Sequence, residues 1–167
     1  QNNSPEVNEK IKGNLKQAVD EAIESVREIS ANISPHILNN FGLKDAVTSF
    51  VKKLRPNERI KIRFDTNIEK RRFSYNVEVI MYRVICELIN NTLRHAEATE
   101  VNISLQVSDD TLRLEYADNG MGFDVEQAES DGGMGLNNMR YRLQSGNGDI
   151  EIESEEGKGM RARAYIK

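Results

Sequence analysis

The chain has 167 residues, of which 38% are hydrophobic and 30% charged, so it is long and apolar enough for one folded domain with at most a small appendage. Its 23 Lys and Arg against 27 Asp and Glu give a net charge of −4, which argues against nucleic acid as the main partner. The single cysteine, Cys86, excludes a disulfide framework and favours a reducing compartment, and no apolar run approaches the roughly 18 residues of a membrane span. Because the chain begins with Gln1 rather than Met, we expect it to be part of a longer protein.

The first third of the chain is predicted to be a long helix with a narrow apolar seam. The seam residues recur at steps of three and four: Ile11, Leu15, Ala18, Ala22, Val26, Ile29 and Ile33. Such a helix either packs on its own domain or forms a dimerisation seam, and its length favours the seam. Ser34 and Pro35 then predict a kink or a new helix start, and a second amphipathic helix is expected over 43–54.

Beyond Pro56 the hydrophobic period changes from that of helices to an alternation of strands and helices. Alternating polar and apolar residues predict half-buried strands, and Asp109 and Asp110 predict a tight turn between two of them. The expected fold class is α+β, a two-layer sandwich with a mixed, largely antiparallel sheet and helices on one face. The expected strands are 59–64, 101–107, 111–116, 149–154 and 160–166, and the expected helices are 77–96 and a shorter one that ends near Gln144.

The first segment that carries chemistry lies on the predicted helix 77–96. Glu87, Asn91 and His95 are spaced four apart and therefore share one face, whereas the opposite side is apolar. A polar row on an otherwise apolar helix is either a solvated surface or the wall of a cleft, and we favour the cleft. An Asn oxygen suits Mg²⁺, which takes hard oxygen ligands and keeps several waters and substrate phosphates. Cys86, beside this row, is expected to be a core residue rather than a nucleophile.

Two glycine-rich segments follow. Asp118, Gly120 and Gly122 come directly after a strand, in a stretch that is either an ordinary turn or a site where a flat ligand approaches the backbone. An Asp at the end of a strand can accept a hydrogen bond from an exocyclic amine, which would distinguish adenine from guanine. The second segment, 132–140, is a glycine loop that opens a helix and presents free N–H groups to an anion. Gly157 and Gly159 form a further pair before the last strand.

These segments, in this order, resemble the ATP-binding domain of sensor histidine kinases, in the superfamily shared with gyrase, Hsp90 and MutL. Residues 87–96 resemble the family's N box, 118–123 its first glycine box, 133–140 its second and 157–159 its third. The resemblance covers roughly residues 43–167, and it is most similar to the nitrate-sensor-like subgroup. It implies the cofactors ATP and Mg²⁺.

The resemblance also implies roles for residues of the N box. Asn91 would coordinate the Mg²⁺ that bridges the phosphates, and it is our one predicted metal ligand. Glu87 would be catalytic together with Asn91, orienting water or polarising the incoming nucleophile. Arg94 and His95 would lie near the phosphates.

The glycine boxes would form the rest of the nucleotide site. Asp118 would accept the adenine amine, with Gly120 and Gly122 admitting the base. The segment 124–132 would be a lid over ATP. The predicted residues at the phosphate-binding helix start are Gly133, Gly135 and Leu136.

The resemblance further implies two parts and a set of partners. Residues 1–41 would be the second helix of a dimerisation hairpin, and residues 42–167 the ATP-binding catalytic domain. The complete protein would be a homodimer through that helix, would pass phosphate to a response regulator, and would hold this domain in the cytoplasm; the sequence does not say whether upstream segments cross a membrane. The acceptor histidine is expected outside this chain, since His36 only partly matches an acceptor motif and is more simply a first-turn histidine.

Two other functions fit the same motifs. An ATPase of the gyrase, Hsp90 and MutL type would use Glu87 as a general base for water, but the short lid and the long leading helix argue against it. A pseudokinase, meaning a nucleotide-binding scaffold without transfer activity, would bind ATP and not react. An anti-sigma serine kinase would leave the leading helix unexplained.

Overall fold

The computed structural model describes residues 35–54, 60–130 and 134–167. The chain divides into two units, residues 1–34 and 35–167. The predicted dimerisation seam lies outside the described residues, so the seam and the proposed domain division stay predictions. Within the described part, no helix combines the length and the hydropathy required to span a bilayer.

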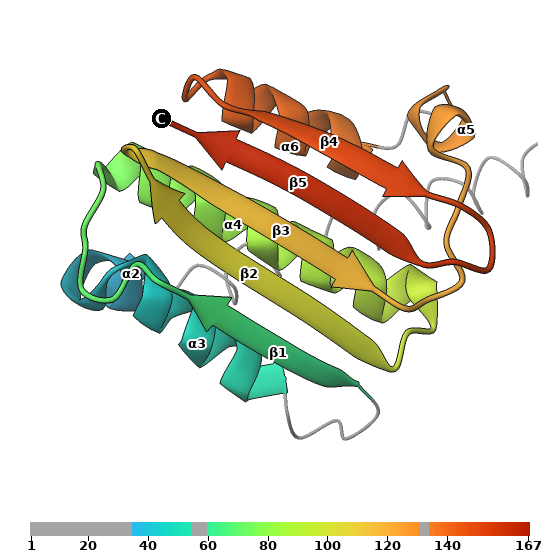
Figure 1. Ribbon diagram of the computed structural model, residues 1–167, viewed down its shortest axis with the longest axis horizontal. Coiled ribbons are helices and arrows are strands. Elements are labelled where there is room, and N and C mark those ends of the chain that lie inside the picture. The colour runs from blue at the N-terminus through green and yellow to red at the C-terminus, as the bar shows by residue number, and fades with distance from the viewer. Residues whose placement is uncertain (1–34, 55–59, 131–133) are drawn as a thin grey trace, which may run out of the picture. The chain divides into compact units, whose positions relative to one another are not determined.

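The second unit is built on one sheet of five strands in the order β1-β2-β3-β5-β4 (Figure 1). β1 pairs parallel with β2, and the other three pairings are antiparallel. The strands are β1 (Lys61–Thr66), β2 (Glu100–Ser108), β3 (Thr111–Asp118), β4 (Asp149–Ser154) and β5 (Met160–Ile166). The predicted α+β sandwich with a mixed, largely antiparallel sheet is therefore confirmed.

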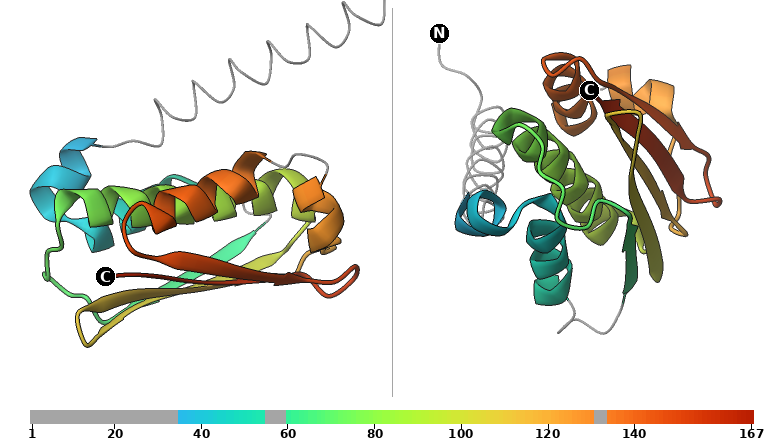
Figure 2. Two further views of the ribbon diagram at one scale, coloured as in Figure 1. Left: turned by 90° about the horizontal axis from the view of Figure 1, so that it is seen from above. Right: turned by 60° about the vertical axis from the view of Figure 1, so that its left-hand side comes forward.

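Helices cover one face of the sheet, as the view along the layers in Figure 2 shows. They are α2 (Pro35–Phe41), α3 (Leu43–Leu54), α4 (Tyr75–Asn91), α5 (Val125–Ser130) and α6 (Met134–Gln144), with a π-helical turn η1 (Thr92–Ala96) directly after α4. The sequence predicted one α-helix over 77–96. Its last five residues instead form the wider turn η1, a form of helix found mostly as single turns at functional sites.

The hydrophobic core lies between these helices and the sheet. α4 is the most buried helix, with Met81, Val84, Ile85, Leu88 and Ile89 all fully buried against the sheet. Cys86 belongs to the same core. Burial raises the pKa of its thiol to about 12, so the thiol stays protonated at neutral pH, as a core cysteine should.

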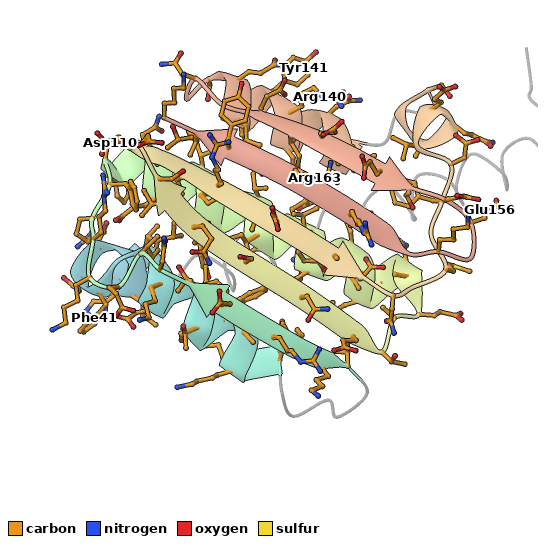
Figure 3. All side chains as sticks on the ribbon, in the orientation of Figure 1. Phe41, Asp110, Arg140, Tyr141, Glu156 and Arg163 are labelled. Carbon is orange, nitrogen blue, oxygen red and sulfur yellow. The ribbon has the colours of Figure 1, made fainter. Side chains whose placement is uncertain are left out.

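The other face of the sheet is open and polar. On β5 buried and exposed residues alternate strictly, so that Arg163 projects from the open face (Figure 3). Its guanidinium lies 3.5 Å from Glu151 and 3.3 Å from Glu153 of the neighbouring strand β4. The alternation fixes which side of each strand faces the helices, and thus where polar residues at strand ends can enter the core layer.

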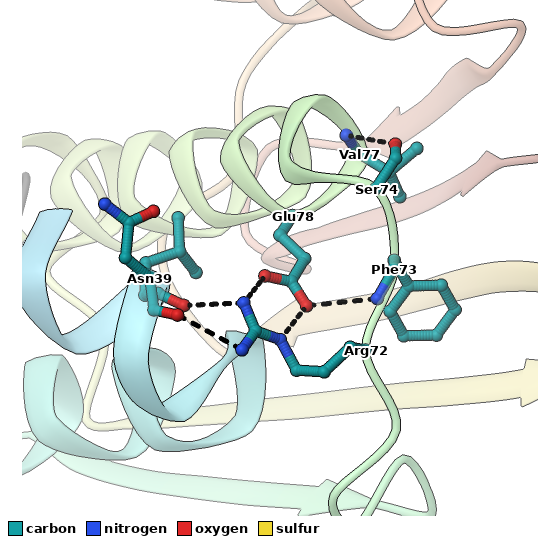
Figure 4. A network of polar contacts seen from close by, with 7 residues as sticks. Asn39, Arg72, Phe73, Ser74, Val77 and Glu78 are labelled. Atoms are coloured by element: carbon teal, nitrogen blue, oxygen red, sulfur yellow. Dashed lines mark hydrogen bonds and ion pairs between the residues drawn. The ribbon is translucent and has the colours of Figure 1, made fainter.

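An ion pair between the buried Glu78 and the partly exposed Arg72 joins α2 to the amino end of α4 (Figure 4). The carboxylate of Glu78 is fully buried and accepts two bonds from Arg72, at 2.9 and 3.0 Å, and one from the Phe73 N–H at 3.1 Å. The same guanidinium donates to the carbonyl oxygens of Asn39 and Leu38, at 3.1 and 3.2 Å, near the end of α2. Hydrogen bonding to Glu78 and the negative charge of its carboxylate raise the pKa of Arg72.

Candidate functional site

A cavity of about 420 Å³ opens at the carboxyl end of α4. That volume lies in the range of pockets that hold small organic ligands. The polar residues along its wall come from α4, η1 and the end of β3: Asn91, Thr92, His95 and Asp118. The apolar part of its lining includes Leu88, Met121, Phe123, Leu136 and Met160.

Asp118 is the anchored carboxylate of this cavity. It ends β3, it is 8% exposed, and its Oδ1 accepts the N–H of Gly120 at 2.9 Å. Its Oδ2 accepts the hydroxyl of Thr92 at 2.7 Å. Both oxygens are thus held by neutral donors within the protein, and the residue still borders the cavity. Such a carboxylate can accept a further hydrogen bond from a ligand that carries an N–H donor.

Close backbone contacts hold the turn after Asp118 against η1. The N–H of Met121 donates to the carbonyl of Ala96 at 2.8 Å, and a Cβ on Gly120 would lie only 2.4 Å from that same carbonyl oxygen. Gly122 has φ +65°, and a Cβ there would lie 2.0 Å from the carbonyl oxygen of Glu155. Glycine is therefore required at both positions for the turn to close on its neighbours.

The predicted third glycine pair supports this turn from behind. A Cβ on Gly159, which has φ +76°, would lie 2.2 Å from the carbonyl oxygen of Asp118, whereas a Cβ on Gly157 would meet nothing within 4 Å. The N–H of Gly157 donates to the carbonyl of Met121, and Ser154 Oγ accepts from Phe123 N–H at 3.0 Å. Neither glycine lines the cavity, so the pair positions the Asp118 turn rather than the ligand.

The start of α6 lies directly against the polar row of α4. A Cβ on Gly135 would lie 2.8 Å from Glu87 Oε1 and 3.6 Å from Asn91 Nδ2. Glu87 and Asn91 are both half-buried. The glycine therefore leaves room for these two side chains at the point where the helix begins.

The structure brings most of the predicted site residues to one place. The cavity is lined by Asn91, His95, Asp118, Gly122, Gly135 and Leu136. Glu87 lies beside the lining residue Gly135, Gly120 lies beside the lining residue Ala96, and Arg94 is exposed on η1. Gly133 lies outside the described residues, as does part of the predicted lid; α5 occupies most of the rest of that segment, and its Ala128 borders the cavity.

Sequence reasoning missed the hydroxyl partners of Asp118. Thr92 is 2% exposed and lies 2.7 Å from the hydroxyl of Tyr116, which is also 2% exposed. Tyr116 lies two residues before Asp118 on the same face of β3, a spacing visible in the sequence. The link to Thr92, 24 residues away, depends on how η1 meets the sheet.

Comparison with protein families matches residues 76–167, more than half of the chain, to the family described as histidine kinase-, DNA gyrase B- and HSP90-like ATPase. The chain belongs to this family. The predicted recognition of this ATP-binding superfamily is confirmed, and every residue of the cavity lining falls within the matched range.

Solved structures of histidine kinases share the fold of this ATPase-family chain. The histidine kinase domain of the Erythrobacter litoralis EL346 blue-light activated histidine kinase is 17% identical, with a TM-score of 0.58 over 72% of this chain and 57% of that one. The larger EL346 structure is 16% identical, with a TM-score of 0.60 over 74% of this chain and 41% of that one. The Acinetobacter baumannii histidine kinase AdeS is 18% identical, with a TM-score of 0.60 over 99% of this chain and 86% of that one.

These neighbours agree with the ATP-binding domain of a histidine kinase that the motifs predicted. This ATPase-family chain spans little more than half of the first neighbour and less than half of the second, so the activity of a complete protein is a separate question. The nitrate-sensor-like subgroup stays a prediction.

Proposed function

We propose that the chain is the ATP-binding catalytic domain of a sensor histidine kinase, which transfers the γ-phosphoryl group of ATP to a histidine for relay to a response regulator. The observation that carries the proposal is the anchored carboxylate of Asp118 in the lining of a cavity that Asn91 and His95 also line. In this arrangement one carboxylate selects the base and the α4 residues face the phosphates.

Base recognition is assigned to Asp118. Its two oxygens are oriented by Gly120 N–H and by the hydroxyl of Thr92, so the remaining lone pairs can accept the 6-amino group of adenine. Apolar side chains such as Met121 and Leu136 line the same cavity and suit the faces of a purine ring. Gly122 would admit the base through the tight turn that it permits, since a Cβ there would meet the Glu155 carbonyl oxygen.

Phosphate binding is assigned to residues of η1 and to the start of α6. His95 and Gly135 line the cavity, and Arg94 extends from the same turn as His95. Gly133 is assigned to the same helix start, and free N–H groups at such a start favour anions. Leu136 would pack beside the nucleotide.

The residues present fit a magnesium ion carried by the nucleotide. Asn91 supplies one amide on the cavity wall, and no group of three His, Cys, Asp or Glu side chains gathers anywhere in 35–54, 60–130 or 134–167. A single oxygen ligand is what Mg²⁺ needs from the protein when phosphates and waters complete its shell. When bound, Mg²⁺ would neutralise charge that develops on the phosphates. Asn91 would hold it there.

Catalysis is assigned mainly to positioning, as phosphoryl transfer requires. Glu87, one turn before Asn91, would polarise the incoming imidazole or orient water. The acceptor histidine would come from the first helix of a dimerisation hairpin, of which residues 1–41 are proposed to be the second helix. The protein would act as a homodimer, with this domain in the cytoplasm.

The test is nucleotide chemistry with the full-length protein. Mg·ATP labelled on the γ-phosphate should yield phosphate that is lost in acid and kept in alkali, bound to a histidine. Asn91→Asp should abolish the label, while the matched surface variant Asn102→Asp, on the open face of the sheet, should keep it. Steady release of phosphate that depends on Glu87, without phosphohistidine, would instead identify an ATPase. Tight ATP binding with neither reaction would identify a pseudokinase.

A further inference from the structure

Two buried hydroxyl groups form a chain that ends on Asp118. The Tyr116 hydroxyl lies 2.7 Å from Thr92 Oγ1, which lies 2.7 Å from Asp118 Oδ2. The same tyrosine hydroxyl is 3.2 Å from the carbonyl oxygen of Leu88. Thr92 and Tyr116 are each 2% exposed, so both hydroxyl groups are buried within the protein.

The protons of this chain have a preferred direction. Each hydroxyl has one proton to donate, and an ionised carboxylate can only accept. Both 2.7 Å contacts are hydrogen bonds when Tyr116 donates to Thr92 and Thr92 donates to Asp118. The Leu88 carbonyl oxygen has a hydrogen-bond donor without Tyr116, because the backbone N–H of Thr92 already donates to it. Burial raises the pKa of the Tyr116 hydroxyl, which favours its protonated, donating form.

The arrangement fixes the orientation of the Asp118 carboxyl group. Gly120 N–H holds Oδ1 at 2.9 Å, and Thr92 holds Oδ2. With both oxygens held, the plane of the group cannot rotate, and its free lone pairs stay directed where a ligand amine would come. If only one oxygen were held, the carboxyl group could still rotate about the Cβ–Cγ bond.

We propose that Thr92 and Tyr116 are positioning residues that hold Asp118 as a fixed hydrogen-bond acceptor, and that they thereby set the preference of the cavity for a purine with a 6-amino group. The proposal rests on the proposed nucleotide-binding function. Under this proposal, nucleobase selection depends on Thr92 of η1 and on Tyr116 and Asp118 of β3, rather than on Asp118 alone.

The test removes the Thr92 hydroxyl from the protein and the 6-amino group from the ligand, separately and together. The binding affinities are measured by calorimetric titration of the full chain. The ligands are ATP and purine riboside triphosphate, which differs from ATP by the absence of the 6-amino group. The unaltered protein should bind ATP about tenfold more tightly, the worth of a hydrogen bond to a charged group. In Thr92→Val the ATP affinity should fall by about tenfold while the affinity for the other ligand changes little, so that the preference disappears. Thr92→Ser should restore it.

Controls separate this role from a contribution to the fold. Thr111→Val removes another buried threonine hydroxyl, at the far end of β3, and should leave the preference intact. Tyr116→Phe keeps the bond from Thr92 to Asp118 and should reduce the preference by about threefold; it decides the question if Thr92→Val does not fold. The proposal is overturned if Thr92→Val and Tyr116→Phe weaken the binding of both ligands equally, or if the ratio of the two affinities does not change. An unaltered protein that binds neither ligand would instead overturn the nucleotide-binding function.

Discussion

A carboxylate is held at each end of α4, and the two are held in opposite ways. At the amino end, Glu78 is fully buried and receives three hydrogen bonds, two of them from the guanidinium of Arg72. At the carboxyl end, Asp118 receives two bonds, both from neutral donors, and borders an open cavity. The first charge is neutralised within the protein. The second is oriented by neutral donors at the cavity, where we propose that it accepts a hydrogen bond from a ligand.

The comparison shows how the local partners of a buried acid reveal its role. A carboxylate that is fully buried and paired with a cation is not accessible to a ligand, so its loss is expected to affect the fold. A carboxylate that is held only by neutral donors and borders a cavity can still accept a hydrogen bond from a ligand, so its loss is expected to affect binding. Four substitutions test this distinction, and their effect is expected to be greatest at Gly159 and least at Gly135.

The largest loss of stability is expected at Gly159, which packs against the carbonyl oxygen of Asp118. Gly159→Ala places a Cβ 2.2 Å from the carbonyl oxygen of Asp118 at a residue with φ +76°, so overpacking and backbone strain act together. We predict a loss of about 4 kcal/mol in the free energy of unfolding, measured by urea denaturation. Gly157→Ala, at φ +80° but with nothing within 4 Å, is the matched control and should cost about 1 kcal/mol. If Gly159→Ala and Gly157→Ala lose the same free energy of unfolding, backbone strain alone explains the loss at Gly159.

At the amino end of α4, Glu78→Ala leaves Phe73 N–H without its acceptor and Arg72 without its carboxylate. We predict a loss of about 3 kcal/mol in the free energy of unfolding, with ATP affinity unchanged. Glu69→Ala, which breaks the exposed ion pair with Lys44, should cost at most about 1 kcal/mol. A fall in ATP affinity without a fall in stability would contradict the role assigned to Glu78.

The converse substitution is Asp118→Asn. An amide cannot accept both Gly120 N–H and the Thr92 hydroxyl through two equivalent oxygens, and its NH₂ group repels the amine of adenine. We predict that ATP affinity falls by about 10- to 100-fold in calorimetric titration. The free energy of unfolding in urea should equal that of the unaltered protein. Asp65→Asn, which removes a strand carboxylate from the open face, should leave both unchanged. A loss of stability like that of Glu78→Ala would remove the distinction.

Much of the fold was predictable because it depends on local patterns. The sequence predicted all five strands, with the first expected at 59–64 and observed at Lys61–Thr66, and the 3.6-residue period predicted α3 to the residue. The glycine and Asp118 positions were predictable because each residue type has few alternatives where the chain must turn tightly or accept a hydrogen bond.

What the sequence could not predict depends on contacts between distant segments. A helical period does not show that α4 gives way to η1 at Thr92, since one wider turn leaves the apolar positions almost unchanged. The bond between Thr92 and Tyr116 joins residues 24 apart, and Arg72 reaches the carbonyl oxygen of Asn39, 33 residues away. Such contacts require the register of the sheet and the packing of the helices, neither of which one sequence pattern contains.

The smallest effect is expected at Gly135, where the cavity meets the polar row of α4. Gly135→Ala places a Cβ 2.8 Å from Glu87 Oε1, but this atom is the end of a flexible side chain and can move. We therefore predict little change in urea stability, since the gain in helix propensity, up to about 1 kcal/mol, offsets the crowding. ATP affinity should fall by about threefold, because displacing Glu87 toward Asn91 costs less than about 1 kcal/mol of binding.

The matched control for this prediction is Asn138→Ala, an exposed position three residues further along α6. It provides a similar gain in helix propensity without a new contact on α4, so its ATP affinity should equal that of the unaltered protein. If both variants bind ATP equally well, then Glu87 and Asn91 do not respond to the start of α6, and the division between a structural and a ligand-facing end of α4 would stop at Asp118. If only Gly135→Ala weakens binding, the ligand-facing end extends from Asp118 across the cavity to Glu87.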